Sequence, residues 1–150
     1  MSDHNQNSTP KTAVILLNMG GPQSNEEVHP YLKELFQDRE LLKLPLQKIL
    51  GNFIAWRRTP KIQQRYAEIG QFSPTLKIME DQGLKISQVL DKRHPQSAPH
   101  VCVSGFRYSE PRTGRMLETF QNAERIILFS QYPQHSLSLI HISEPTRPLY

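Results

Sequence analysis

The sequence has 150 residues, enough for one domain and too few for two ordinary ones. Its 18 basic and 14 acidic residues give a net charge of +4, too mild for the concentrated basic stripe of a nucleic-acid-binding protein, so no nucleic-acid partner is predicted. No stretch reaches the ~18 apolar residues that span a membrane, and the polar start, Met1–Lys11, shows no secretory signal. The single cysteine, Cys102, excludes an internal disulfide and any cysteine-built zinc or iron–sulfur site within these residues.

The first elements are a tail, a strand and a helix. Residues 1–10 are polar and are predicted to be a disordered tail. Ala13–Asn18 is a continuous apolar run with β-branched residues, typical of a buried strand in a parallel sheet, and the following Gly-Gly-Pro forces a loop. A helix carrying Tyr31 and Leu35 is then expected, capped by Ser24 or Asn25.

The most unusual stretch is Leu41–Trp56, which is apolar, contains a proline and a glycine, and is followed at once by two arginines. Two interpretations stay open. It is either an amphipathic helix facing the core, or an apolar lip that dips into a membrane or lines the pocket of an apolar ligand.

The rest of the chain alternates between helices and strands. Pro60 is expected to open a new helix, because proline favours a first helical position, and Gly70 to end it. The remaining predicted elements are helices at 61–69, 75–90 and 112–121 and strands at 101–106 and 125–129. This alternation predicts an α/β fold, a mostly parallel, Rossmann-like layered sheet.

Ligands of such open sheets bind at the carboxyl ends of the strands. Topology therefore nominates Met19, Arg107, Tyr108 and residues 131–133. Met19 could equally be a core residue, and Arg107 a salt-bridged surface residue. Gly20-Gly21 is not a dinucleotide motif, since the pattern G-x-G-x-x-G is absent.

A second candidate set combines Arg57 and Arg58 with Tyr66, eight residues further on. Arginine binds carboxylates through a fixed fork and stacks on aromatic rings, so these residues could hold an anionic ring compound. The alternative is a solvated basic cluster. The six histidines are scattered and read as surface residues, and no nucleophile stands in a triad motif.

Several motifs occur in an order that closely resembles the amino-terminal half of ferrochelatase, especially the mitochondrial type. They are LLNMGGP (16–22), RRTPKIQQRYAEIG (57–70), SP (73–74), APH (98–100), GFRY (105–108) and QYPQ (131–134). The resemblance implies a lyase that inserts ferrous iron into protoporphyrin IX, the last step of haem biosynthesis. It also implies that this chain is the first, truncated, of two chelatase-type α/β domains, with the porphyrin in the cleft between them.

The resemblance also assigns roles to individual residues. It places Met19 against the macrocycle near the metal entry path, and Arg107 in the pocket on the side where metal passes. Arg58, Tyr66 and Ser73 would hold the porphyrin propionates or face, with Arg57 supporting them at the rim.

The implied location is the matrix side of the mitochondrial inner membrane, with the bacterial cytoplasm as the alternative. Peripheral membrane contact is expected through the apolar residues of the lip, namely Leu41, Leu42, Leu44, Leu46, Ile49, Leu50, Phe53 and Trp56. A homodimer, and a 2Fe-2S cluster in the longer parent, are left open. No metal site and no resident cofactor are expected within this chain.

The chain departs from the family pattern at two notable places. The usual GGGSP is here GQFSP (70–74), which adds side chains where the backbone approaches the ring. Residues 137–150 read like a translated sequencing adapter, so the partial amino-terminal domain is expected to cover 11–136 and to be followed by a non-native tail.

The catalytic histidine and the acidic proton acceptors of the family lie in its second half. No catalytic residue is therefore expected here, and the chain alone is expected to be inactive. The alternative function is that of a non-catalytic, short porphyrin- or haem-binding isoform.

Overall fold

The computed structural model describes residues 10–70 and 72–132. Its sheet has three parallel strands in the order β2-β1-β3, formed by β1 (Thr12–Asn18), β2 (His100–Phe106) and β3 (Arg125–Ser130). The central strand β1 is buried along nearly its whole length, as its uninterrupted apolar sequence requires of a strand covered on both faces. The predicted α/β class and parallel sheet are confirmed. The expected tail at 1–10, apart from Pro10, and the expected non-native segment at 137–150 lie outside the described residues.

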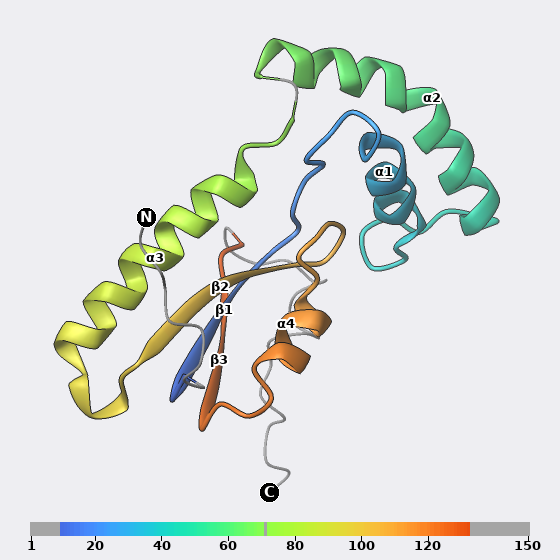
Figure 1. Cartoon of the computed structure of the whole chain (residues 1–150). Helices are drawn as coiled ribbons and strands as arrows, with labels where there is room; N and C mark the ends of the chain where they lie inside the picture. Colours follow the sequence, from blue (N-terminus) through green and yellow to red (C-terminus); the bar gives the residue numbers. More distant parts are fainter. Residues whose placement is uncertain (1–9, 71, 133–150) are drawn as a thin grey trace, which may run out of the picture.

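Helices cover the two faces of this sheet (Figure 1). On one face α3 (Thr75–Arg93) packs along β2, where Val14, Leu16, Met79 and Phe106 form a buried core cluster. On the other face lies the short α4 (Thr113–Thr119), which precedes the edge strand β3. Cys102 is half-buried against the core cluster.

A helical hairpin projects from the carboxyl ends of the strands (Figure 1). It is built from α1 (Val28–Gln37) and α2 (Gln47–Glu68). The predicted cap of α1 by Ser24 or Asn25 is wrong, because the helix begins only at Val28 and has no side-chain cap. This later start places Pro30 in the first turn, where its missing N–H breaks no helical bond.

The prediction that Pro60 opens a new helix is also wrong, because α2 runs through it without interruption. Proline inside a helix costs about 3 kcal/mol. Contacts on both sides of it offset this cost: Ala55 before the proline, and Ile62 and Tyr66 after it, pack in the cluster formed with α1. Gly70 follows the helix with a positive φ of 109°, as predicted for a terminating glycine.

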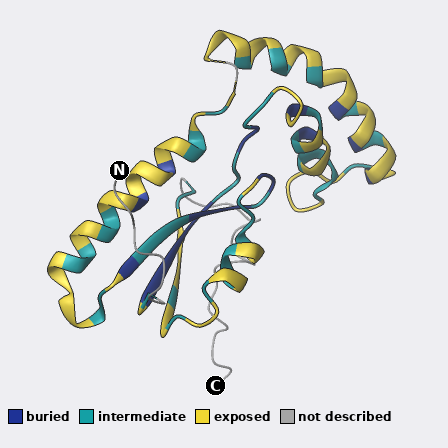
Figure 2. Cartoon of the chain, viewed as in Figure 1, coloured by how far each residue is buried: buried dark blue, intermediate teal, exposed yellow. Residues whose placement is uncertain are grey.

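Small residues set the distance between the two helices of the hairpin. Gly51 and Ala55 are buried, and Figure 2 shows the buried segments of α2 on its side toward α1. A Cβ atom added at Gly51 would lie 2.8 Å from the carbonyl oxygen of Phe36 in α1. The two helices therefore approach closely at Gly51, while Ile62 and Tyr66 further along α2 pack into the cluster with α1.

Candidate ligand site at the carboxyl ends of the strands

The loop Met19–Pro22, directly after β1, is the hub of the candidate site. Its Gly21 N–H donates to the hydroxyl of Ser109, 3.1 Å away, beyond the end of β2. A Cβ at Gly21 would lie 2.5 Å from the Ser73 hydroxyl, so the α2–α3 connection closes directly onto this loop. Gly20 has a φ of +83°, a conformation that side chains other than glycine rarely adopt. The two glycines thus let segments distant in sequence meet at one edge of the sheet.

Four tyrosines gather around this hub, and we call Tyr31, Tyr66, Tyr108 and Tyr132 the tyrosine cluster. The Tyr31 hydroxyl donates to the carbonyl of Gly20 at 3.3 Å, and its ring meets that of Tyr108 edge to face at 6.3 Å. Tyr66 packs beside Tyr31 between α1 and α2. Each member comes from a different element or strand end, so the cluster forms only in the folded chain.

The phenols of this cluster stay protonated at physiological pH. Burial, with smaller contributions from Tyr66 and Tyr132, raises the pKa of Tyr31 to about 12. Burial likewise raises the pKa of Tyr132 to about 12. Burial raises the pKa of Tyr108 as well, reinforced by its hydrogen bond to Asp38. The cluster is therefore an uncharged group of aromatic rings at this edge of the sheet, with Tyr108 buried and the other three half-buried.

Arg107 lies at the same edge and is bound to two carboxylates. Its Nη2 atom is 2.6 Å from Asp38 Oδ2 and 2.8 Å from Glu40 Oε2, and its guanidinium lies 5.6 Å from the centre of the Tyr108 ring. Burial lowers the pKa of Arg107, but the hydrogen bonds and charges of these partners outweigh it and raise the pKa overall. The positive charge of Arg107 is thus already compensated within the chain.

Arg57 and Arg58 lie in the middle of α2, away from this network, and both are exposed. The Arg58 guanidinium stacks 5.4 Å above the ring of Phe36. Within the described residues, neither arginine takes part in an ion pair. Their charges remain available for an anion at the rim of the hairpin.

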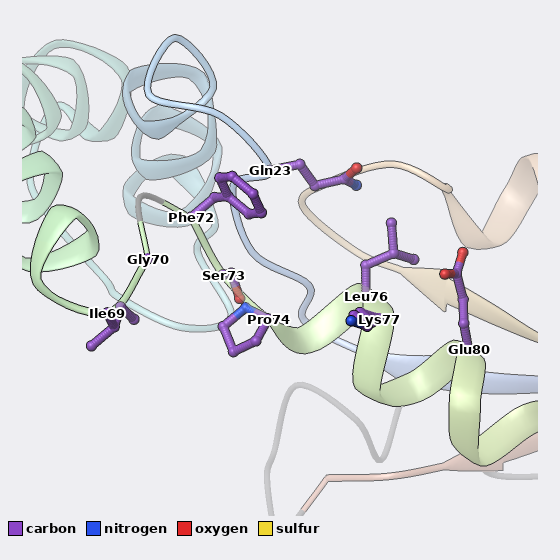
Figure 3. A pocket seen from close by; sticks show the side chains of 9 residues that line it. All are labelled: Gln23, Ile69, Gly70, Phe72, Ser73, Pro74, Leu76, Lys77 and Glu80. Carbon is purple, nitrogen blue, oxygen red and sulfur yellow. The ribbon is translucent and has the colours of Figure 1, made fainter.

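Ser73 is held in the loop between α2 and α3. Its N–H donates to the carbonyl of Pro22 at 2.9 Å, and its hydroxyl shares a hydrogen bond with Thr75 at 2.8 Å. Beside it lies a cavity of about 320 Å³ with a mainly apolar lining (Figure 3). Phe72, one of the two residues that depart from the family's glycines, lines this cavity and is half-exposed. The departure therefore adds an aromatic ring next to Ser73.

Several large apolar side chains at the start of α2 are exposed. Ile49, Phe53 and Trp56 recur at helical spacing and are 70%, 53% and 65% exposed, and Leu46, directly before the helix, is 76% exposed; we call these four residues the apolar stripe. One side of this stretch does face a core, since Ala55 packs in the buried cluster with α1, but the residues on that side are small and the large apolar ones are exposed. Of the other expected lip residues, Leu41 and Leu42 are exposed and Leu44 and Leu50 are half-buried. Within the described part of the chain, no helix has the length and hydrophobicity that a membrane crossing requires.

The structure thus brings Met19, Tyr66, Ser73 and Arg107 around one loop system and leaves Arg57 and Arg58 on the adjoining rim. Met19 is half-buried, and its carbonyl accepts the N–H of Tyr108 at 3.1 Å. The sequence alone indicated neither Asp38 nor Tyr31 as site residues. Their partners lie 70 and 11 residues away in the chain, and no local motif marks such pairs.

No group of three or more metal-ligating side chains lies among the described residues. The chain has a single cysteine, and burial raises the pKa of the Cys102 thiol, which disfavours the thiolate that binds metals. An iron–sulfur cluster therefore does not fit these residues.

A three-stranded parallel sheet flanked by helices, with the candidate residues at its carboxyl edge, defines an α/β fold of the Rossmann-like class. The ferrochelatase family model matches residues 11–141. The chain belongs to the ferrochelatase family.

Three mitochondrial ferrochelatases illustrate the similarity. The Drosophila melanogaster protein is 48% identical over 129 residues, which cover 85% of this chain and 34% of the relative. The Xenopus laevis protein is 47% identical over 131 residues (86% and 32%), and the Dictyostelium discoideum protein 46% over 128 residues (84% and 30%). The chain spans about a third of the length of these relatives.

Proposed function

We propose that this chain forms the amino-terminal wall of a ferrochelatase, the lyase that inserts ferrous iron into protoporphyrin IX. The observation that carries the proposal is the uncharged tyrosine cluster at the carboxyl edge of the sheet, next to two exposed arginines on α2. Family membership and the names of the relatives support the same reaction.

The proposed roles of the individual residues follow from the chemistry of the porphyrin. The flat, apolar macrocycle would lie against the tyrosine cluster, near Met19 and Ser73. Its two propionates carry negative charge, and the exposed guanidinium groups of Arg57 and Arg58 would bind them as hydrogen-bonding forks. Arg107 is already paired with Asp38 and Glu40, so it would line the pocket rather than bind a propionate.

We further propose that the parent protein works on the matrix side of the mitochondrial inner membrane. The relatives are named as mitochondrial, and the apolar stripe supplies an exposed surface that a lipid interface would cover. Any 2Fe-2S cluster of the parent would need ligands beyond the single cysteine present here.

The test is a titration of the purified chain with protoporphyrin IX and with its dimethyl ester, which lacks the propionate charges. The chain should bind the free acid more tightly than the ester. The double variant Arg57→Gln/Arg58→Gln should lose about 3- to 10-fold in affinity for the acid only, which corresponds to up to about 0.7 kcal/mol for each exposed charge. Arg65→Gln removes the same charge elsewhere on α2 and serves as the control.

Equal binding of acid and ester, or an equal loss in the Arg65→Gln control, would contradict the assignment of the two arginines. No binding of either compound would contradict the porphyrin site as a whole. We expect no zinc or iron insertion above background by the chain alone, and measurable insertion would refute the view that the catalytic groups lie outside it. Porphyrin binding by a natural chain of this length, without insertion, would favour the non-catalytic alternative.

A further inference from the structure

One acidic residue, Asp38, joins the two parts of the candidate site. It follows the last residue of α1 and begins the segment 38–46 that leads into α2, which we call the lip segment. Its Oδ2 atom accepts hydrogen bonds from Arg107 Nη2 at 2.6 Å and from the Tyr108 hydroxyl at 2.5 Å. Arg107 and Tyr108 stand at the end of β2, about 70 residues further along the chain.

The remaining acceptor atoms of Asp38 hold the lip segment itself. Its Oδ1 atom accepts the N–H of Glu40 at 2.8 Å, and its backbone carbonyl accepts the N–H of Leu42 at 3.1 Å. The side chain is only 12% exposed, so these bonds are largely shielded from water. Hydrogen bonds to a shielded carboxylate are among the stronger ones in proteins.

Asp38 differs in this respect from its acidic neighbours. Glu40 also pairs with Arg107, at 2.8 Å, but it is 42% exposed and reaches no tyrosine. Glu34 forms a two-bonded pair with Arg112, which also links α1 to the segment after β2. That pair is exposed, and its Arg112 Nη1 also donates to the backbone carbonyl of Arg107 at 2.6 Å, but it contacts neither the Arg107 guanidinium nor the Tyr108 hydroxyl. Among the described acidic residues, Asp38 is the one seen to bond both the Arg107 guanidinium and a member of the tyrosine cluster.

We propose that Asp38 is a positioning residue of the tetrapyrrole site, fixing the Arg107 guanidinium and the Tyr108 ring and coupling them to the lip segment. The identity of the ligand in this inference rests on the proposed function, whereas the hydrogen bonds of Asp38 do not depend on it. Loss of the Asp38 carboxylate would free Arg107, Tyr108 and the lip segment together. Porphyrin binding would then have to order these side chains, and the lost conformational entropy would lower the affinity.

The test compares Asp38→Asn with the matched control Glu34→Gln in the same chain. Asparagine has nearly the shape of aspartate but lacks its charge, so the exchange isolates the charge-assisted bonds. The first readout is amide hydrogen exchange without any ligand. Asp38→Asn should speed exchange by at least about 10-fold at once in residues 38–46 and in residues 107–109. Glu34→Gln should leave residues 38–46 within about 2-fold of the unchanged chain, because its partner Arg112 contacts only the backbone carbonyl of Arg107 and not the lip segment.

The second readout is the affinity for protoporphyrin IX, which should fall about 10-fold in Asp38→Asn and by less than 2-fold in Glu34→Gln. Far-UV circular dichroism and a thermal melt establish whether Asp38→Asn is folded. If it is not, Asp38→Glu keeps the charge and should restore slow exchange in both segments.

Unchanged exchange in a folded Asp38→Asn, faster exchange in one segment only, or equal effects of both variants would overturn the proposal. If the unchanged chain does not bind porphyrin, the proposed function fails, and hydrogen exchange alone decides the role of Asp38.

Discussion

The apolar stripe on α2 predicts that the chain binds lipid surfaces, and two of its side chains allow the strength to be worked out. Phe53 and Trp56 lie with their ring centres 6.1 Å apart and are 53% and 65% exposed. Full burial of a large apolar side chain contributes about 1.5–3 kcal/mol, so covering their exposed parts adds about 1–2 kcal/mol each. Replacing both by aspartate should therefore remove about 2–4 kcal/mol, roughly a 30- to 700-fold loss in partitioning.

Sedimentation with uncharged phosphatidylcholine vesicles measures this loss, because such vesicles isolate the apolar contribution from charge attraction. The control is Asn52→Asp/Gln64→Asp, which adds the same two negative charges to exposed positions of α2. It should bind nearly as well as the unchanged chain. Vesicle binding that survives Phe53→Asp/Trp56→Asp, or that falls equally in the control, would refute the assignment of the stripe to a lipid interface.

Two further predictions concern stability. Gly51→Ala should lower the melting temperature by several degrees, because the new Cβ would clash with the Phe36 carbonyl. Such overpacking destabilises the fold by about 1–3 kcal/mol, whereas the better helix propensity of alanine stabilises it by at most ~1 kcal/mol. Gly114→Ala, which meets nothing within 4 Å, should leave the melting temperature unchanged or slightly higher in the same thermal scan. Burial raises the pKa of Asp38, but its hydrogen bonds with Tyr108, the Glu40 N–H and Arg107 outweigh this and lower the pKa overall. Its carboxylate therefore stabilises the fold above the unfolded pKa of about 3.9, and this stability is lost as pH falls through the folded pKa. The unchanged chain should melt at a higher temperature than Asp38→Asn at pH 7, and this difference should shrink below about pH 4. A difference that stays constant down to pH 2 would contradict the prediction.

The strands could be predicted to within one or two residues because each is a short apolar run rich in β-branched residues. The strand predicted at 101–106, for example, is His100–Phe106 in the structure. Helix ends were less accessible, since the course of α2 through Pro60 depends on contacts with α1 that no local pattern records. The structure places Arg107 and Tyr108 directly after β2, at the strand end where the alternation of elements predicted them, and their role in ligand binding stays a prediction.

What sequence reasoning missed was the partnership between segments. Two interpretations of Leu41–Trp56 stayed open, because hydropathy shows that the stretch is apolar but does not show which side of a helix packs against another element. The small residues Gly51 and Ala55 held the decisive signal, because a helix can pack closely only along its smallest side. Asp38 gave no such signal, as one acidic residue after a helix is common on protein surfaces.

The close contact between α1 and α2 at Gly51 also means that the two sides of α2 tolerate substitution differently. Gly51 lies against the backbone carbonyl of Phe36 as well as the Gln37 side chain, so a side-chain exchange on α1 cannot fully compensate for a larger residue there. The outward side of the same helix has no such constraint, and one large apolar residue can replace another without disturbing the wall behind it. Lineages with membranes of different lipid composition could therefore retune the outer side of α2 residue by residue while inheriting its inner side unchanged.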